Sequence, residues 1–102
     1  MKNYQSIFYL SIYDLEDNNI QYIINSDIKY TSNQAFKSGL NKVYEAFYKG
    51  LLNNVKSISV YYYIYKINKN KYIIYQDGLL DDYLNIMEVN NNGEKNKQKR
   101  KI

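Results

Sequence analysis

The sequence predicts a two-layer α+β fold, in which one long helix packs on one face of an antiparallel sheet of about four strands. Three observations carry this prediction: two segments of alternating side chains come first, one segment with helical spacing follows, and two more alternating segments come last. A single sheet covered by a single helix is the simplest way to bury both apolar surfaces. The chain of 102 residues has the length of one domain. We expect this domain to span residues 1–93 and a flexible basic tail to span residues 94–102.

The first two strands are predicted from their alternation. Residues 4–13 alternate, and their two faces differ: Phe8, Leu10 and Ile12 on one, Tyr9 and Tyr13 on the other. The polar residues 14–19 then form a break of the kind that turns a hairpin. Residues 20–30 alternate again, and Asn25-Ser26-Asp27 indicates an interruption by a bulge or a turn.

A helix is predicted over residues 32–52. Its apolar side chains recur at spacings of three or four and form one stripe: Phe36, Leu40, Val43, Phe47 and Leu51. Thr31 and Gln34 fit a capping box at the start, and Gly50 supplies the stop. Gly39 weakens the prediction, since glycine inside a helix costs about 1 kcal/mol relative to alanine.

Residues 55–67 and 71–76 are predicted to form a second hairpin. Every side chain of residues 60–65 is β-branched or aromatic, which favours a strand. Asp77-Gly78 is expected to end this hairpin. Residues 79–89 fit a short C-terminal helix capped by Asp77 and, less well, a further strand.

The net charge of the chain resides in its last nine residues. Residues 1–93 hold nine Lys and nine Asp or Glu, whereas residues 94–102 hold five basic groups and one acid. The body therefore offers no charge argument for binding nucleic acid. The tail supplies candidate contacts with nucleic acid or with an acidic partner: Lys95, Lys97, Lys99, Arg100 and Lys101. The alternative is a solvated tail that acts as a solubility device.

Residue types that catalysis and metal binding commonly use are missing. The chain has no Cys and no His, which removes thiolate chemistry, the commonest general base and the commonest zinc ligand. Acidic clusters at residues 14–17 and 77–82 lack the spacing of a calcium loop, and turns or helix capping explain them. We therefore expect no enzyme, no cofactor and no metal. With no run of about 18 apolar residues and no signal-peptide pattern, we expect a soluble cytoplasmic protein without membrane association.

Tyrosine is the residue type that carries the functional prediction, with 14 Tyr against three Phe and no Trp. If Phe8 faces the helix, strand parity places five tyrosines on the opposite face: Tyr9, Tyr13, Tyr61, Tyr63 and Tyr65. Tyrosine gives a large contact area at low entropic cost, so these five are candidate partner-binding residues. The alternative is that an AT-rich gene encodes Tyr in place of Phe, with half-buried rings and hydroxyls in water.

Short proteins that lack cysteine and are encoded by AT-rich genes are common in phages, viruses and plasmids. These features therefore favour a non-catalytic binding protein from one of these sources. Such a protein would occupy a surface on a host protein or nucleoprotein complex in the host cytoplasm. Inhibitors of host defence of the anti-CRISPR type are the expected kind of activity. Two alternatives stay open: a direct DNA- or RNA-binding protein that uses the tyrosines and the tail, and a homodimer or larger homo-oligomer that pairs through a sheet edge or face.

Overall fold

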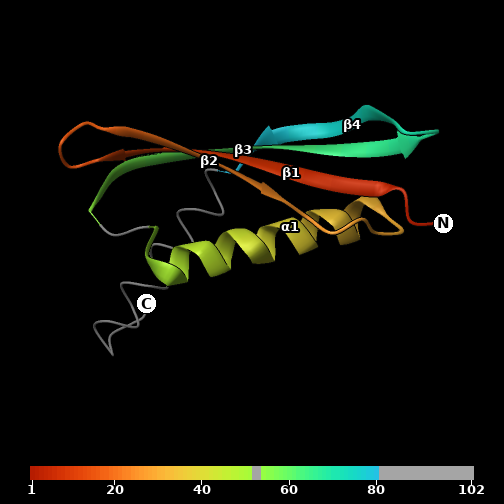
Figure 1. Cartoon of the computed structure of the whole chain (residues 1–102), viewed down its shortest axis with the longest axis horizontal. Helices are drawn as coiled ribbons and strands as arrows, with labels where there is room; N and C mark the ends of the chain where they lie inside the picture. Colours follow the sequence, from red (N-terminus) through yellow and green to blue (C-terminus); the bar gives the residue numbers. More distant parts are fainter. Residues whose placement is uncertain (52–53, 81–102) are drawn as a thin grey trace.

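A computed structural model describes residues 1–51 and 54–80 of the chain. These residues form four strands and one long helix, followed by a π-helical turn (Figure 1). The element bounds are β1 Tyr4–Asp14, β2 Asn19–Asn25, α1 Ser32–Ala46, η1 Phe47–Leu51, β3 Val55–Asn68 and β4 Lys71–Leu79. None of the helical segments in this part of the chain has the length and apolar character needed to cross a membrane.

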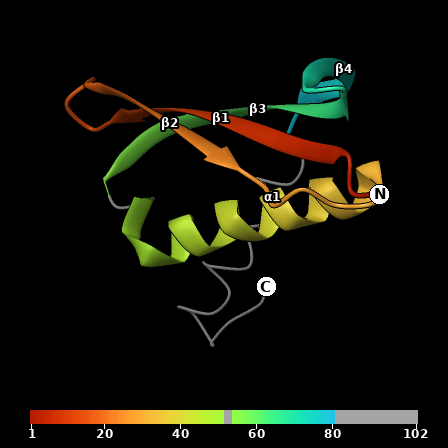
Figure 2. The same ribbon diagram turned by 45° about the vertical axis from the view of Figure 1, so that its right-hand side comes forward.

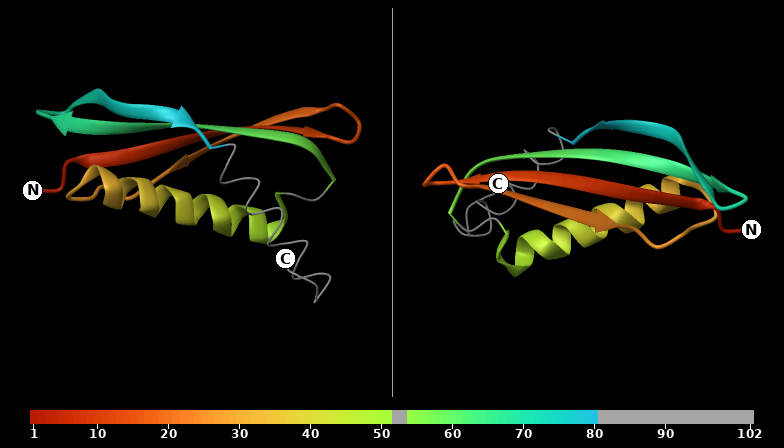
Figure 3. Two further views of the ribbon diagram at one scale, coloured as in Figure 1. Left: turned by 180° about the vertical axis from the view of Figure 1, so that it is seen from behind. Right: turned by 45° about the horizontal axis from the view of Figure 1, so that its top comes forward.

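The four strands form one antiparallel sheet in the order β2-β1-β3-β4. Helix α1 runs along one face of this sheet, so the molecule has two layers (Figures 1 and 2). The right half of Figure 3 looks onto the other face, which no described helix or strand covers. The predicted α+β class and the order of the elements are confirmed.

The core lies between α1 and the inner face of the sheet. Alternation along β1 directs Phe8, Leu10 and Ile12 toward the helix, where each is at most 3% exposed. The helix and β3 complete this core with further buried side chains: Leu40, Val43, Phe47, Val60 and Ile64. Phe36 packs against the same cluster and is partly buried. The predicted helical stripe is therefore confirmed at four positions, and the side chain of the fifth, Leu51, lies outside what the structure describes.

Local chemistry sets both ends of the helix. The Thr31 hydroxyl oxygen accepts a hydrogen bond from the Gln34 N–H at 3.1 Å, as the predicted cap requires. At the other end the last turn widens to a π-helical turn, and Gly50 takes a φ of 114°. Glycine adopts this left-handed conformation without a Cβ penalty, so it ends the helix as predicted. The regular α-helix itself ends at Ala46, before the predicted boundary at residue 52.

Two buried serines, Ser6 of β1 and Ser26, hold the corner after β2. The strand ends at Asn25, at the interruption predicted over residues 25–27, and does not resume before residue 30. The Ser6 N–H donates to the Ser26 hydroxyl oxygen at 2.8 Å, and the Ser26 N–H donates to the Ser6 carbonyl at 2.9 Å. The Ser6 hydroxyl in turn donates to the Ala35 carbonyl of α1 at 2.6 Å. Because buried polar groups are costly when unpaired, these bonds hold β1, the corner and the helix together.

The predicted end of the second hairpin at Asp77-Gly78 is wrong, and so is the role of Asp77 as a helix cap. Strand β4 continues through both residues to Leu79. Asp77 accepts a hydrogen bond from the Tyr61 hydroxyl of β3 at 2.9 Å, which explains an acidic residue in the strand. Gly78 lies against the Tyr62 ring, where an added Cβ would come within 3.1 Å of a ring carbon. The glycine here allows a close approach and does not form a turn.

Leu80 follows β4 and is buried at 2% exposure, so the chain enters the core again after the sheet. The predicted alternatives for residues 79–89 lie outside the described residues from position 81 onward. The predicted tail, residues 94–102, also lies outside them.

Gly39 marks the closest approach of α1 to β1. It is buried, and a Cβ added there would overlap the Phe8 ring and the Ser6 hydroxyl. The glycine that weakens the helix prediction therefore has a packing reason: it lets the helix backbone sit directly on the central strand.

Gly39→Ala is expected to destabilise the protein although alanine is the better helix former. The gain in helix propensity is about 1 kcal/mol, whereas overpacking a tight contact costs about 1–3 kcal/mol. Because the added Cβ would overlap the Phe8 ring, the upper end of this range applies, and we expect a net loss of about 2 kcal/mol. Urea unfolding measures the difference. The control is Asn41→Ala, at an exposed position of the same helix, which should leave stability unchanged or raise it slightly. A Gly39→Ala variant at least as stable as the wild type would contradict the close packing.

Candidate functional site

The five tyrosines that parity placed together lie on the sheet face that points away from α1. We call this surface the tyrosine face, defined by Tyr9, Tyr13, Tyr61, Tyr63 and Tyr65. Tyr9 and Tyr13 are 38% and 44% exposed, and the three residues of β3 are half-buried. Their chain neighbours Phe8 and Val60 point into the core, as alternation requires.

Strand register arranges this face in rows. Tyr9 pairs with Ile23 on one side and Tyr61 on the other, and Tyr61 pairs with Leu79. Directly paired residues share a face, so these four side chains form a row across all four strands. Ile23 and Leu79 are 65% and 60% exposed, and the row therefore presents apolar surface from one edge of the sheet to the other.

The tyrosine rings support one another, with Tyr63 at their centre. Its ring centroid lies 5.7 Å from that of Tyr9, 5.1 Å from that of Tyr61 and 5.9 Å from that of Tyr65. These spacings are typical of favourable edge-to-face and offset aromatic pairs. Tyr13 lies further along β1, about 13 Å from Tyr9 for a four-residue separation in a strand, and so belongs to the face but not to this cluster.

A shallow hollow of about 440 Å³ lies over the cluster and is lined by Tyr9, Tyr61, Tyr63, Tyr65 and Ile74. Tyr72 extends the aromatic surface further, with its ring 5.9 Å from that of Tyr65. Four of the five predicted residues therefore line one concave surface, which the sequence could not show.

The tyrosine face carries little charge. Among the residues that register places on it in β1–β4, Asp77 is the one charged side chain. The carboxylate of Asp77 accepts the hydrogen bond from Tyr61 and thereby raises the pKa of that hydroxyl above its ordinary value. The pKa of Tyr65 is also raised, chiefly because its hydroxyl is partly withdrawn from water. The hydroxyls of Tyr61 and Tyr65 are therefore neutral at physiological pH.

Sequence reasoning missed the apolar side chains at the margins of this face: Ile23, Tyr72, Ile74 and Leu79. The alternation of β2 contained the signal for Ile23, because it has the opposite parity from Tyr22. In β4 a register shift between Ile74 and Gln76, opposite Tyr65 and Ile64, changes the parity, and simple alternation could not reveal it.

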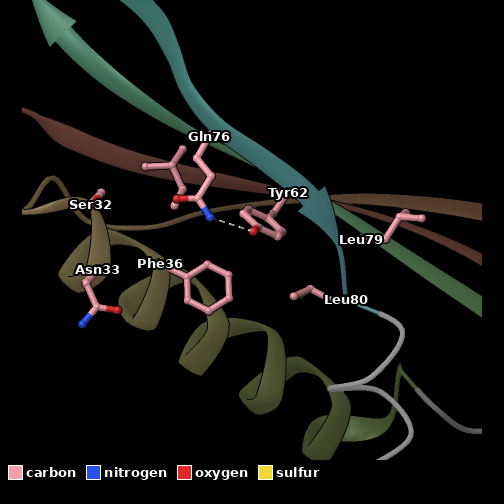
Figure 4. A pocket seen from close by; sticks show the side chains of 8 residues that line it. Ser32, Asn33, Phe36, Tyr62, Gln76, Leu79 and Leu80 are labelled. Atoms are coloured by element: carbon pink, nitrogen blue, oxygen red, sulfur yellow. Dashed lines mark hydrogen bonds between the residues drawn. The ribbon is translucent and has the colours of Figure 1, made fainter.

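A second hollow, of about 280 Å³, lies on the helix side between the start of α1 and the β3–β4 hairpin (Figure 4). Phe36 and Tyr62 meet there edge to face at 5.0 Å, and the Gln76 side-chain amide donates to the Tyr62 hydroxyl at 3.2 Å. Leu80, which borders it, is the last described residue. The groups around this hollow are engaged with one another, and we assign no site to it.

Lysines gather at one end of the molecule. This lysine end comprises the N-terminus, the first three turns of α1 (residues 32–42) with the segment before it, and the β3–β4 hairpin (Figure 1). It contains seven of the nine described lysines: Lys2, Lys29, Lys37, Lys42, Lys66, Lys69 and Lys71. A hollow of about 420 Å³ is lined by three of them, Lys2, Lys29 and Lys37. Residues 1–93 have no net charge, yet this end of the molecule carries a strong positive charge.

Acidic groups mark the opposite end, at the turn between β1 and β2. Asp14 accepts hydrogen bonds from the Asn18 and Glu16 N–H groups at 2.9 Å each, and these bonds lower the pKa of its carboxyl. Asp17 forms an ion pair with Lys56. The predicted turn role of this cluster is confirmed. At the lysine end, Asp27 pairs with Lys42 at 3.0 Å, and this contact lowers the pKa of Asp27.

Residues 1–51 and 54–80 contain no group of three or more Asp, Glu, His or Cys side chains that could hold a metal ion. The chain matches no protein-family model, no curated protein and no solved structure. The interpretation of its surfaces therefore depends on the residues themselves.

The raised pKa of Tyr61 gives a direct test of the geometry of the tyrosine face. Ionised Tyr61 would stand beside the Asp77 carboxylate and lose the hydrogen bond that it donates, so the neutral form is favoured. Asp77→Asn should therefore lower the pKa of Tyr61 toward its ordinary value near 10.0. The raised pKa of Tyr65 should persist, because burial is its main cause. A pH titration of the tyrosine ring carbons by NMR measures both pKa values. An unchanged pKa of Tyr61 in the variant would contradict the hydrogen bond between Tyr61 and Asp77.

Proposed function

We propose that the protein is a non-catalytic binding protein that docks its tyrosine face on a protein partner. The observation that carries the proposal is the continuous aromatic and aliphatic surface across four strands, with Asp77 as the one charged group among its described strand residues. Large, contiguous apolar patches are uncommon on monomers and typical of interaction sites. Tyrosine suits this role because its hydroxyl stays hydrated when the partner is absent and its ring supplies contact area when the partner binds.

Charge favours protein over nucleic acid as the partner of this face. Bases stack on tyrosine rings, but the phosphates beside them need cations, and Asp77 would repel them. Two of the three lysines of strands β3 and β4 have the other parity: Lys66 pairs with Tyr4, and Lys71 pairs with Asn68. The third, Lys56, lies at the register shift beside Tyr13 and forms an ion pair with Asp17. The tyrosine face therefore offers stacking surface without the positive charge that single-stranded nucleic acid requires.

The rings are also positioned for binding before any partner arrives. Tyr63 is held by Tyr9, Tyr61 and Tyr65, all of which project from the two central strands. A side chain that is already ordered loses less conformational entropy when it is buried at an interface. This support favours Tyr63 as the central anchor of the contact.

The same proposal includes the kind of partner and source. The partner is a host protein or a nucleoprotein complex, and the chain is the product of a phage, virus or plasmid that inhibits or modulates it, as an anti-CRISPR-type protein does. The composition supports this part, because Lys, Asn, Ile and Tyr, whose codons are rich in A and T, make up 55 of the 102 residues.

Tyr63→Ser is expected to weaken partner binding by about 1–3 kcal/mol, because it removes the central ring of the face. The fold should persist, since the opposite face of β3 supplies the core. Retention of host proteins on the immobilised chain, measured by quantitative mass spectrometry after nuclease treatment, gives the readout. One protein or complex should be retained by the wild type and lost by the variant.

Two matched substitutions separate binding from folding. Tyr48→Ser removes a ring that is 66% exposed in the π-helical turn and should change neither property. Tyr62→Ser removes a ring that packs on Phe8 and Phe36, so it should lower the unfolding midpoint. If Tyr63→Ser unfolds the protein, or if retention is equal for Tyr63→Ser and Tyr48→Ser, the proposed face is wrong.

A second candidate function, direct binding of nucleic acid, is favoured by a separate observation, the lysine end. Seven lysines and the N-terminal amine gather there, and Asp27 is the one acidic group that the described residues place among them. Such a cluster can neutralise several phosphates and release their counterions. This surface is distinct from the tyrosine face, and the predicted tail contacts would add to it.

Nucleic-acid binding would reveal itself through its dependence on salt. A double Lys29→Glu, Lys37→Glu variant should lose affinity for a fluorescent single- or double-stranded oligonucleotide and should show a shallower slope of log affinity against log salt. Tyr63→Ser should leave both quantities unchanged. A chain truncated after Gly93 reports the share of the tail. If the double variant binds as tightly as the wild type, the lysine end is not a nucleic-acid site.

A further inference from the structure

Strand β2 forms one edge of the sheet, and the hydrogen-bond pattern shows which of its backbone groups face outward. The Asp14 N–H donates to the Asn18 carbonyl and the Ser26 N–H donates to the Ser6 carbonyl, both in the register of β1 with β2. In an antiparallel ladder the bonded pairs alternate, so the even-numbered residues between these points bond to β1. The N–H and C=O groups of the odd-numbered residues point away from the sheet: Asn19, Gln21, Ile23 and Asn25.

This edge lacks the features by which proteins block strand pairing. Its seven residues include no charge and no proline, and its register with β1 runs without a bulge. Six of the seven side chains are exposed, including Ile20, Tyr22 and Ile23. No described backbone group bonds to the outward side of the strand.

The other edge, β4, is different. It carries Lys71 near its start and Asp77 near its end, and its register shifts between Ile74 and Gln76. The extra residue interrupts the regular spacing of its outward N–H and C=O groups, and charges and bulges both oppose edge-to-edge pairing. The contrast marks β2 as the edge that is free to pair.

We propose that two copies of this chain pair through β2, antiparallel, to form a dimer with one continuous sheet. The register follows from the outward groups: Asn19 pairs with Asn25 of the second copy and Gln21 pairs with Ile23. Tyr22 then meets its own equivalent on the two-fold axis. All four outward residues of each copy are bonded in this register, whereas a shift by two residues in either direction loses one of these pairs.

The side chains and charges of the two copies are compatible with this arrangement. Ile20 faces Ile24 and Tyr22 faces Tyr22 on the helix side, so cross-strand neighbours there are apolar or aromatic. Because the two strands run in opposite directions, the acidic turn at residues 14–17 of one copy lies toward the lysine end of the other. That end holds Lys2 and Lys29 near the corner after β2. Asp27 in this corner is paired with Lys42, and Asp17 in the turn is paired with Lys56. The remaining charges, Asp14 and Glu16 on one copy and Lys2 and Lys29 on the other, are opposite in sign at both ends of the contact.

Paired residues share a face, so the two helices lie on the same side and the two tyrosine faces become one surface. A contact made by one seven-residue strand is smaller than the roughly 1,200–2,000 Å² of a typical stable interface, so the dimer should depend on concentration. Sedimentation equilibrium or light scattering should show the mass rising from 12.2 kDa toward twice that value. Added salt should shift the equilibrium toward monomer, since the facing charges are exposed.

Proline substitutions on the two edges test which strand pairs. Gln21→Pro removes an outward N–H of β2 and leaves the bonds to β1 in place, whereas Tyr72→Pro does the same on the outer side of β4. The first should shift the dimer equilibrium at least tenfold toward monomer, and the second should leave it unchanged. Circular dichroism verifies that each variant is folded. If Gln21→Pro fails to fold, the double Gln21→Lys, Ile23→Lys variant replaces it, because it places like charges opposite each other across the contact.

Hydrogen exchange separates edge pairing from contact through the tyrosine face. The N–H groups of Gln21 and Ile23 should become protected as concentration rises, while that of Tyr22 is protected throughout by its bond to β1. A mass of 12.2 kDa at every concentration would overturn the proposal. So would a dimer that survives the β2 substitutions, or one in which Gln21 and Ile23 exchange freely.

Discussion

The contact of α1 with β1 at Gly39 is the constraint on which the rest of the structure depends. The missing Cβ lets the helix backbone reach the Phe8 ring, and the Ser6 hydroxyl fastens strand to helix by its bond to the Ala35 carbonyl. This contact determines that the even-numbered residues of β1, such as Phe8, face the core. Because a strand has a period of two, Tyr9 and Tyr13 must then face outward. The ladders to β2 and β3 transmit the same choice across the sheet, since paired residues share a face.

Much of this arrangement could be predicted from the sequence because the signals were periodic. The change from alternation to helical spacing and back identified the helix and all four strands, and Thr31 and Gly50 marked the helix ends through their own local chemistry. Parity then placed the five tyrosines. The sequence predictions were wrong where a residue type that usually forms a turn instead makes a contact within a strand. Gly78 makes a close approach to Tyr62, and Asp77 makes a cross-strand bond to Tyr61, yet glycine and aspartate together are the usual signal of a turn.

Other features depend on contacts between segments that are distant along the chain. The gathering of lysines at one end appears when the N-terminus, the start of α1 and the β3–β4 hairpin come together, and no window of sequence contains it. The hollow over the tyrosine cluster likewise needs the bulge in β4, which brings Ile74 onto the face. The composition shows that basic and acidic residues balance in residues 1–93. It could not show that the lysines gather at one end of the molecule and the acidic turn lies at the other.

The tyrosine face and the β2 edge use different chemistry and do not compete for the same groups. Side chains stand perpendicular to a sheet, whereas the free N–H and C=O groups of an edge lie in its plane. A partner on the tyrosine face and a second copy on β2 can therefore bind together, and pairing would present two such faces to one partner. The lysine end behaves differently. In the antiparallel dimer each lysine end approaches the acidic turn of the other copy, which reduces the positive charge that a polyanion would meet. Dimerisation should therefore support binding through the tyrosines and oppose binding of nucleic acid through the lysines, because the same charges cannot satisfy both.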